Sequence, residues 1–200
     1  MTSRSDTERS DGRPDAVLAR DPALEPLVTD HGPVEIDTAD DPFERLVVSI
    51  LRQQISMAAA RSIRERLFEA VEVTPEGLVA ADEATLRDAG LSSQKATYVR
   101  NVAEAFRERD YDREAFEEMD DDAVVAELTS IAGVGDWTAK MFLLFCLGRE
   151  DVFPVEDLGI RKGMQALLGE DLTRGEMVER AERWRPYRSY ASLYLWRHAD

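Results

Sequence analysis

A proline-containing segment over residues 153–162, with the sequence FPVEDLGIRK, places one carboxylate where it could do chemistry. Pro154 favours an extended loop, and the residues after Asp157 have helical spacing, so Asp157 is expected to begin a helix. A carboxylate at that position can simply cap the helix. The positive end of the helix dipole also keeps a carboxylate ionised, which suits a group that faces a developing positive charge. Asp157 is therefore the candidate catalytic residue, with capping as the alternative.

A glycine-rich turn precedes this segment in residues 128–139, which have the sequence LTSIAGVGDWTA. Helical segments flank Gly133 and Gly135. Glycines allow a tight turn and leave the N–H groups of the second helix accessible, where they can bind a phosphate oxygen without a lysine. A helix-hairpin-helix DNA contact and an ordinary helix–helix turn both fit this segment on its own.

Aromatic residues concentrate near the C-terminus, where they can form either a core or a surface on which a flat ligand stacks. They are Trp184, Tyr187, Tyr190, Tyr194 and Trp196. The other candidates for chemistry are weaker. The acidic run 110–122 is expected to be solvent-exposed rather than a metal site, and His31 and His198 are expected on the surface. Cys146 is expected in the core.

The elements that position these residues are predicted to be helices, because almost every segment has helical spacing and helical end signals. No alternating run of β-branched residues is long enough for a sheet, so the predicted fold class is all-α with about ten helices. They are expected over residues 41–51, 56–71, 74–80, 82–90, 93–109, 121–131, 136–147, 157–168, 174–184 and 187–198, with a short one inside 110–122.

The length of 200 residues predicts one domain or two small lobes. Residues 1–15 are expected to form a disordered acidic tail, and residues 16–200 the folded domain. The single cysteine excludes a disulfide framework, a cysteine-based zinc site and an iron–sulfur cluster held by four thiolates. The sequence has no apolar run of membrane-spanning length and no signal-peptide core, so we expect a cytoplasmic protein that does not bind membranes.

The net charge of −16 argues, taken alone, against nucleic acid as a partner. The charge is uneven, however, because residues 1–40 and 101–130 carry −6 and −8 of it, and 22 of the 25 basic residues are arginine. Acid-rich, lysine-poor surfaces suit a protein that is kept soluble in concentrated salt, where charge repulsion is screened. We therefore expect a halophilic protein whose charge reflects its solvent and not its ligand.

The order and spacing of the turn, the Asp157 loop and the aromatic segment resemble the helix-hairpin-helix/GPD superfamily of DNA glycosylases. The resemblance is strongest to its 3-methyladenine DNA glycosylase II, or AlkA-like, branch. It covers about residues 40–198 and lacks the N-terminal β domain of larger relatives. The matching segments are SILRQQIS (49–56), GVGDWTAKMF (133–142), DVFPVEDLGIRKG (151–163) and ERWRPYRSYASLYLW (182–196).

The resemblance implies a role for each matching residue in a fold of two helical lobes with the active-site cleft between them. Asp157 is the implied catalytic residue, and the implied base pocket consists of Trp137, Tyr187 and Trp196. The implied DNA-binding residues are Gln53, Gln54, Gly133, Gly135 and Thr138, with Gln54 or Ile55 filling the gap left by a flipped nucleotide. Backbone carbonyls of Ile131 and Gly133 are implied ligands of a monovalent cation, and no cofactor is expected.

Four positions depart from the patterns of this superfamily. Ala132 stands where a hairpin proline is common, and Met141 and Leu158 stand where AlkA-like enzymes often carry tyrosines, which leaves the base preference open. Trp137 stands where bifunctional members carry a lysine nucleophile. The expected reaction is therefore hydrolysis without strand cleavage.

The resemblance thus predicts a monofunctional DNA N-glycosylase that flips out alkylated bases of the 3-methyladenine and 7-methylguanine type and releases them in base-excision repair. The expected partner is double-stranded DNA, bound by a monomer that is associated with the nucleoid. The alternatives are a glycosylase for deaminated bases such as hypoxanthine or uracil, a non-catalytic protein that binds DNA damage, and an acidic helical interaction module.

Overall fold

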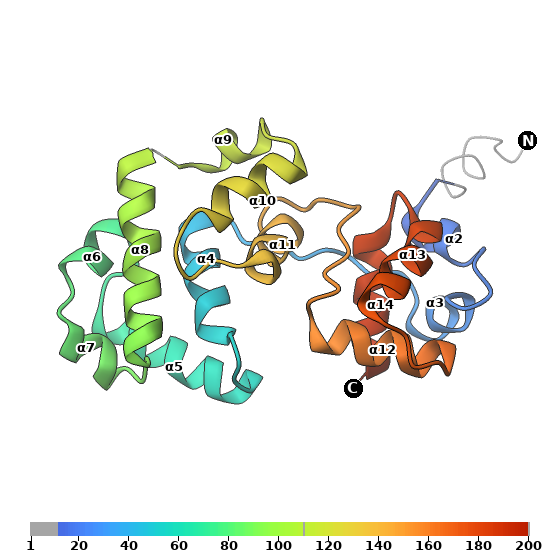
Figure 1. Ribbon diagram of the computed structural model, residues 1–200, viewed down its shortest axis with the longest axis horizontal. Helices are drawn as coiled ribbons and strands as arrows, with labels where there is room; N and C mark the ends of the chain where they lie inside the picture. Colours follow the sequence, from blue (N-terminus) through green and yellow to red (C-terminus); the bar gives the residue numbers. More distant parts are fainter. Residues whose placement is uncertain (1–11, 110, 200) are drawn as a thin grey trace, which may run out of the picture. The chain divides into compact units, whose positions relative to one another are not determined.

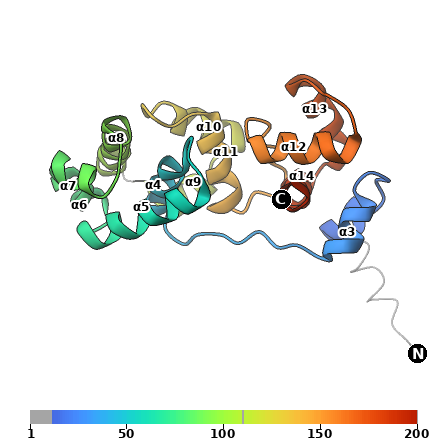
Figure 2. The same cartoon turned by 90° about the horizontal axis from the view of Figure 1, so that it is seen from below.

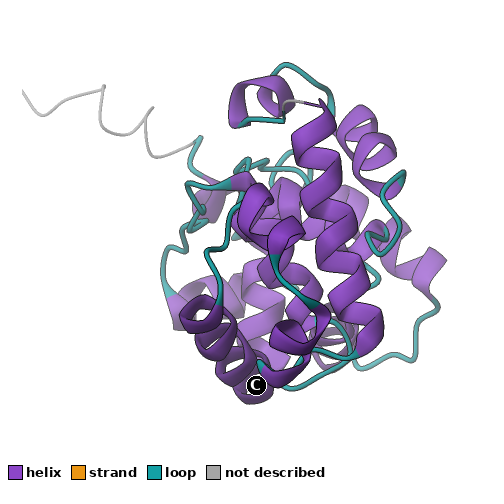
Figure 3. Cartoon of the chain, turned by 90° about the vertical axis from the view of Figure 1, so that its left-hand side faces the viewer, coloured by secondary structure: helices purple, strands orange, loops and turns teal. Residues whose placement is uncertain are grey.

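The structure, a computed structural model, describes residues 12–109 and 111–199, and these residues form helices and loops without a strand (Figures 1 and 3). The all-α prediction is therefore confirmed. The described residues divide into two compact units, one of residues 12–37 and 148–199 and one of Thr38–Leu147. The active-site cleft expected between two lobes stays a prediction. No helix in the described ranges has the length and apolar character needed to cross a membrane.

The unit Thr38–Leu147 contains eight of the described helices. They are α4 (Pro42–Arg52), α5 (Met57–Ala70), α6 (Pro75–Ala80), α7 (Glu83–Asp88), α8 (Ser93–Arg109), α9 (Arg113–Glu117), α10 (Asp121–Thr129) and α11 (Asp136–Phe145). Most of them begin at a polar cap whose side-chain oxygen accepts a hydrogen bond from a backbone N–H three residues on. These caps are Asp41, Ser56, Thr74, Asp82, Asp112 and Asp120.

Helix α4 is central to this unit, because it packs against α5, α8 and α11 (Figures 1 and 2). Its side chains Leu46, Val47 and Ile50 are fully buried. Phe116 and Phe142 meet edge to face with ring centroids 4.9 Å apart and extend the same core. The core therefore fixes the end of α4, from which the predicted DNA-binding turn at residues 53–56 starts.

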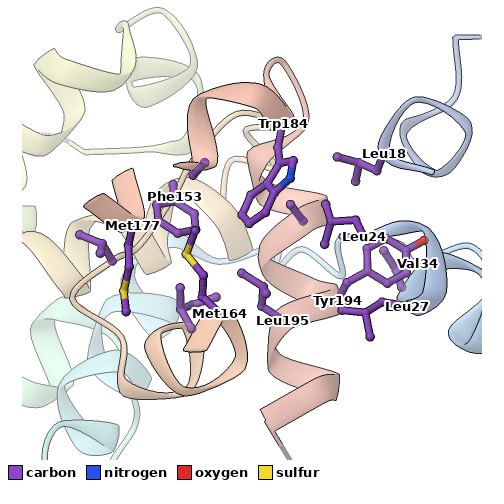
Figure 4. Packing of buried hydrophobic residues seen from close by; sticks show 14 residues of the cluster. Leu18, Leu24, Leu27, Val34, Phe153, Met164, Met177, Trp184, Tyr194 and Leu195 are labelled. Carbon is purple, nitrogen blue, oxygen red and sulfur yellow. The ribbon is translucent and has the colours of Figure 1, made fainter. Parts of the chain in front are cut away.

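The other unit is built from both ends of the chain. Its helices are α2 (Pro14–Leu18), α3 (Glu25–His31), α12 (Leu158–Leu168), α13 (Arg174–Ala181), the 3-10 turn η1 (Glu182–Trp184) and α14 (Arg188–Ala199). Figure 4 shows Leu27 of α3, Met164 of α12 and Tyr194 of α14 within one buried cluster. The Tyr194 hydroxyl donates to the carbonyl of Gly32 at 2.9 Å, so the N-terminal helices are tied to α14.

The predicted disordered tail differs from the structure at its C-terminal end. Residues 1–11 of that tail lie outside the described residues. Pro14 and Asp15 belong to α2, where proline at the first helical position is favourable because its missing N–H is not needed. The Asp15 carboxylate also pairs with Arg13 at 2.7 Å. The prediction of a tail through residue 15 is therefore wrong for residues 14 and 15.

The predicted exposure of His31 and His198 and the predicted burial of Cys146 are confirmed. Within the acidic run 110–122, Asp112 and Asp120 are exposed and also cap helices. No group of three or more potential metal ligands occurs among the residues that the structure describes. His31 and His198 are exposed. Cys146 is buried, and burial raises the pKa of its thiol to about 11.

Candidate functional site

Asp157 begins helix α12 and forms the centre of the candidate active site. Its Oδ1 accepts a hydrogen bond from the backbone N–H of Ile160 at 3.1 Å, as an N-cap does. The same oxygen accepts a second hydrogen bond from the indole Nε1 of Trp196 at 2.8 Å. The two roles expected for this carboxylate are therefore compatible, since the capping contact also orients it beside an aromatic ring.

A glycine two residues later makes this contact possible. A Cβ at Gly159 would lie 2.8 Å from Cδ1 of Trp196 and 3.1 Å from its Nε1, distances that require the indole to move. Gly163, one turn further on, lets α12 approach the backbone of Leu195 in α14 in the same way. The glycines of α12 thus hold the catalytic candidate against α14. The only sequence signal for this role is the spacing of the two glycines, four residues apart on one helix.

The loop that leads to Asp157 is held by the beginning of α14. Arg188 binds the Asp151 carboxylate through Nε at 2.7 Å and Nη2 at 3.0 Å, and Nη2 also donates to the Asp151 carbonyl at 2.9 Å. Ser189 is buried; its hydroxyl donates to the carbonyl of Arg149 and accepts from the N–H of Val152. Arg188 and Ser189 therefore position the loop that leads to Asp157. The residue types of the WRPYRS segment did not indicate this role.

Further charged residues surround the ion pair of Arg188 and Asp151. A hydrogen bond from Arg185, together with the charges of Arg188 and Arg185, lowers the pKa of the exposed Glu182 carboxyl. Arg188 also donates to Glu182 at 2.9 Å. The side chain of Arg188 is only 13% exposed, so its contacts are better shielded from solvent than an ordinary surface ion pair.

Tyr187 lies directly before α14. Its hydroxyl donates to the carbonyl of Gly12 at 2.9 Å, and its ring meets Tyr190 edge to face with centroids 5.9 Å apart. Tyr187 and Trp196 are both partly buried and pack against the same buried cluster of this unit. A base pocket that contains both of these aromatic residues stays a prediction.

The glycine hairpin lies in the unit Thr38–Leu147, between α10 and α11. Gly133 has a φ of +107°, a conformation that suits glycine. Gly135 is the N-cap of α11 and supplies no side-chain cap, and a Cβ there would meet no atom within 4 Å. Helix α11 therefore begins at two exposed residues, Gly135 and Asp136, without a side-chain cap, which is compatible with a phosphate contact.

A second exposed element follows α4 in the same unit. Gln54 is exposed and has a φ of +57°, which is uncommon for a residue other than glycine. Ile55 and Met57, which follow it, are 38% and 64% exposed, and few large apolar side chains among the described residues are as exposed. The turn 53–56 thus presents polar and apolar groups together, as a segment that fills a gap in a base stack requires.

Gln53 connects this turn to the hairpin. Its Nε2 donates to the carbonyl of Gly133 at 3.0 Å and to Oγ1 of Thr138 at 3.1 Å. Thr138 is 1% exposed. The side chains of Gln53 and Thr138 therefore make their contacts within the protein, where they connect the turn to the hairpin. A contact of either residue with DNA stays a prediction.

Comparison with known proteins agrees with this geometry. The family model described as "HhH-GPD superfamily base excision DNA repair protein" matches residues 47–188. The chain belongs to the HhH-GPD superfamily. The match includes the turn 53–56, the hairpin and Asp157, and it ends before Trp196.

Individual relatives are similar over most of their length. The chain is 31% identical to "DNA-3-methyladenine glycosylase 1" of Schizosaccharomyces pombe, over 86% of this chain and 78% of that protein. A solved structure of the S. pombe 3-methyladenine DNA glycosylase in complex with abasic DNA has a TM-score of 0.85 at 29% identity, and covers 92% of this chain and 95% of that one. The Bacillus halodurans DNA-3-methyladenine glycosidase has a TM-score of 0.81 at 35% identity, with coverage of 95% and 91%.

Both carbonyls of the cation site predicted at the hairpin accept hydrogen bonds within the protein. The carbonyl of Ile131 accepts a hydrogen bond from the N–H of Val134 at 3.0 Å. The carbonyl of Gly133 accepts one from the Gln53 amide at 3.0 Å. Each carbonyl oxygen has a second lone pair, so the cation site stays a prediction, and we derive no step through a bound ion.

Trp137 is half-buried in the first turn of α11, in the unit that carries the hairpin. Asp157 and Trp196 belong to the other unit. The structure therefore brings Asp157 and Trp196 together within one unit, and Gln53, Thr138 and Gly133 within the other. A place for Trp137 in the base pocket stays a prediction.

Proposed function

We propose that this member of the HhH-GPD superfamily is a monofunctional DNA N-glycosylase that hydrolytically releases alkylated bases from double-stranded DNA. The observation that carries the proposal is the carboxylate of Asp157, held at the N-terminus of α12 by the Ile160 N–H and the Trp196 indole. Similarity to proteins named DNA-3-methyladenine glycosylase supports the choice of alkylated bases. We further propose that the protein works as a monomer in the cytoplasm, on nucleoid DNA.

The carboxylate suits the charge that develops when such a base leaves. N-alkylation makes the base cationic and a good leaving group, and its departure leaves positive charge on the sugar, as in glycoside hydrolysis. Hydrogen bonds from Ile160 and Trp196 orient the Asp157 carboxylate, whose negative charge stabilises that positive charge and which orients the attacking water. Trp137 occupies the position of the lysine nucleophile of bifunctional members, so we expect no strand cleavage.

The exposed elements of the unit Thr38–Leu147 suit the DNA-binding part of the reaction. We propose that a phosphate binds at the open start of α11 and that Gln54 or Ile55 enters the base stack when the damaged nucleotide rotates out. Backbone N–H groups make the phosphate contact, so the contact does not require a lysine and can form although the net charge of the chain is −16. The flipped cationic base then stacks on the indole of Trp196.

The proposal is tested by identifying, with mass spectrometry, the bases released from methylated duplex DNA. The wild-type protein is expected to release 3-methyladenine and 7-methylguanine and to leave the strands intact. Asp157→Asn is expected to slow release by about a thousandfold, whereas Glu156→Gln, a change of the adjacent carboxylate, is expected to release bases at the wild-type rate. Release by Asp157→Asn at the wild-type rate, or none by the wild type, would contradict the proposal. Release only from duplexes that contain hypoxanthine or uracil would favour the deaminated-base alternative.

A further inference from the structure

Helix α8 carries three side chains that contact the two DNA-binding elements of its unit. Lys95, Tyr98 and Asn101 follow each other at intervals of three residues, so each is rotated by about 60° from the one before and all lie on one side of the helix. None of the three was singled out by the sequence patterns. Lys95 reaches the last turn of α4, directly before the turn 53–56, and Tyr98 and Asn101 reach the hairpin 132–135.

Lys95 fixes the start of the turn. Its ammonium donates to the carbonyl of Leu51 at 2.6 Å, in the last turn of α4. Carbonyls at a helix C-terminus lack partners within the helix and attract a positive charge. Burial lowers the pKa of Lys95, so this contact is made with a partly dehydrated group. The turn 53–56 begins two residues after Leu51.

Tyr98 and Asn101 fix the hairpin. A Cβ at Gly133 would lie 2.5 Å from Cδ1 of Tyr98, so the hairpin backbone rests directly on the tyrosine ring. The side-chain amide of Asn101 donates to the carbonyl of Ala132 at 2.9 Å. The hairpin is therefore held at two successive residues by side chains that come from the same helix as Lys95.

The third connection runs directly between the two elements. The Gln53 amide donates to both the Gly133 carbonyl and the Thr138 hydroxyl, so the turn is tied to the hairpin without α8. The contacts from α8 to the end of α4, from α8 to the hairpin and from the turn that follows α4 to the hairpin form a closed set. A closed set of contacts holds its members at fixed spacing better than the same contacts in an open chain.

We propose that Lys95, Tyr98 and Asn101 are positioning residues that set the spacing between the turn 53–56 and the hairpin 132–135, and with it the ability to hold duplex DNA with a nucleotide out of the stack. The inference rests on the proposed function, in which both elements contact one duplex. Pre-ordered contacts bind more tightly, because less conformational freedom is lost on binding. The higher affinity is expected for DNA with an unstacked nucleotide, which engages both elements, and not for undamaged DNA.

The first test measures, without DNA, how firmly the turn and the hairpin are held. Lys95→Met keeps the aliphatic stem and removes the ammonium, and Asn101→Ala removes the hairpin contact while leaving Lys95 in place. Amide hydrogen exchange in peptides covering residues 53–57 and 131–136 is expected to accelerate by about tenfold in both variants. The control Arg107→Met removes one charge from the exposed end of the same helix and is expected to leave both peptides unchanged. Unchanged exchange in Lys95→Met and Asn101→Ala would overturn the proposal.

The second test measures the consequence for DNA. Affinity is measured for a duplex with a tetrahydrofuran abasic analogue and for the same duplex undamaged. The ratio of the two affinities is expected to fall by about tenfold in Lys95→Met and Asn101→Ala and to stay at the wild-type value in Arg107→Met. At saturating protein, the fluorescence of 2-aminopurine beside the abasic position is expected to be lower with the two variants than with the wild type. Partial unfolding alone would not cause this difference.

The outcomes separate this inference from the proposed function. If the wild-type protein prefers the abasic duplex and both variants keep the full preference, the spacing role is wrong and the glycosylase proposal stands. If the wild type releases no base but the exchange and affinity ratios change as expected, the glycosylase proposal is wrong and the spacing role stands. If Lys95→Met does not fold, Asn101→Ala, whose amide is at the surface, gives the decisive result.

Discussion

The two regions that the proposed reaction needs are held in place in different ways. In the unit of residues 12–37 and 148–199, one carboxylate is fixed by the Trp196 indole, and Gly159 lets that indole approach. In the unit Thr38–Leu147, the turn 53–56 and the hairpin are fixed by several side chains that donate to backbone carbonyls. The catalytic region thus depends on a single charged group, and the DNA-binding region on a shared set of contacts.

This difference predicts different effects of mutation. The charge that stabilises the transition state is concentrated in Asp157, so a change there should lower kcat and leave DNA affinity nearly intact. Contacts to DNA are divided over many backbone groups, so a single change there should cost a part of the affinity and appear mainly in KM. Each prediction below tests one side of this contrast.

The largest effect is expected for Asp157→Asn. Asparagine keeps the capping oxygen and the shape but removes the negative charge, so single-turnover release of a methylated base should slow by about a thousandfold. Affinity for a duplex with an abasic analogue should stay within about twofold of wild type, because the charge acts on the transition state. A loss of affinity as large as the loss of rate would show that Asp157 serves DNA binding and would remove the contrast.

A smaller loss of rate is expected for Gly159→Ala. The added methyl would lie 2.8 Å from Cδ1 of Trp196, so the indole must move away from the carboxylate. Base release should slow by about tenfold to a hundredfold, and overpacking should lower the free energy of unfolding by about 1–3 kcal/mol. Both are measured on the same protein, by single-turnover release and by denaturant titration.

Gly175→Ala is the matched control for that substitution. A Cβ at Gly175 of α13 would meet no atom within 4 Å, and alanine is the better helix former. We expect unchanged base release and a gain of about 0.5–1 kcal/mol in the free energy of unfolding. A loss of activity in this control would mean that Gly159→Ala reports general sensitivity of the unit and not the indole contact.

Trp196→Phe separates the two functions of the indole. Phenylalanine keeps an aromatic face for stacking and loses the N–H that donates to Asp157 at 2.8 Å. We expect kcat to fall by about tenfold with little change in KM, because the lost hydrogen bond orients the carboxylate and does not bind DNA. A rise in KM with unchanged kcat would assign Trp196 to stacking alone.

Much of the fold was predictable because helix ends are encoded over a few residues. Asp41, Ser56 and Thr173 each cap a helix through a backbone N–H three residues away, so a short sequence window contains both partners. The same locality made Asp157 visible as the residue that begins α12. Its second partner was not predictable, because the Trp196 contact spans 39 residues and depends on how α12 packs on α14.

The contacts of the site's side chains were the least predictable part of the sequence. The Tyr187 hydroxyl donates to the carbonyl of Gly12, which is 175 residues away in the chain. Thr138 is buried, and its hydroxyl accepts from Gln53, which is 85 residues away. A sequence motif identifies the region in both cases and not the direction of the side chain, because that direction depends on contacts between distant segments.

The smallest predicted effect concerns the charge at the hairpin. Asp136 is exposed in the first turn of α11, directly after Gly135, so its carboxylate repels a phosphate at the same N–H groups. Asp136→Asn is expected to raise the affinity for undamaged duplex DNA by about threefold at about 0.1 M salt. The gain should vanish at about 1 M salt, where charges are screened over about 3 Å. Fluorescence anisotropy titrations at both salt concentrations measure this.

The control for this prediction is Asp88→Asn, which removes an exposed charge from α7 in the same unit. If Asp88→Asn raises the affinity for DNA much less than Asp136→Asn does, the hairpin is the phosphate contact. The reason is that a charge close to the bound phosphate affects binding more than a distant, screened charge. Equal gains would mean that the total charge of −16, and not the hairpin, limits binding. The halophilic interpretation requires in addition that the wild-type protein releases bases at molar salt, since screening then removes repulsion without weakening contacts made by backbone N–H groups.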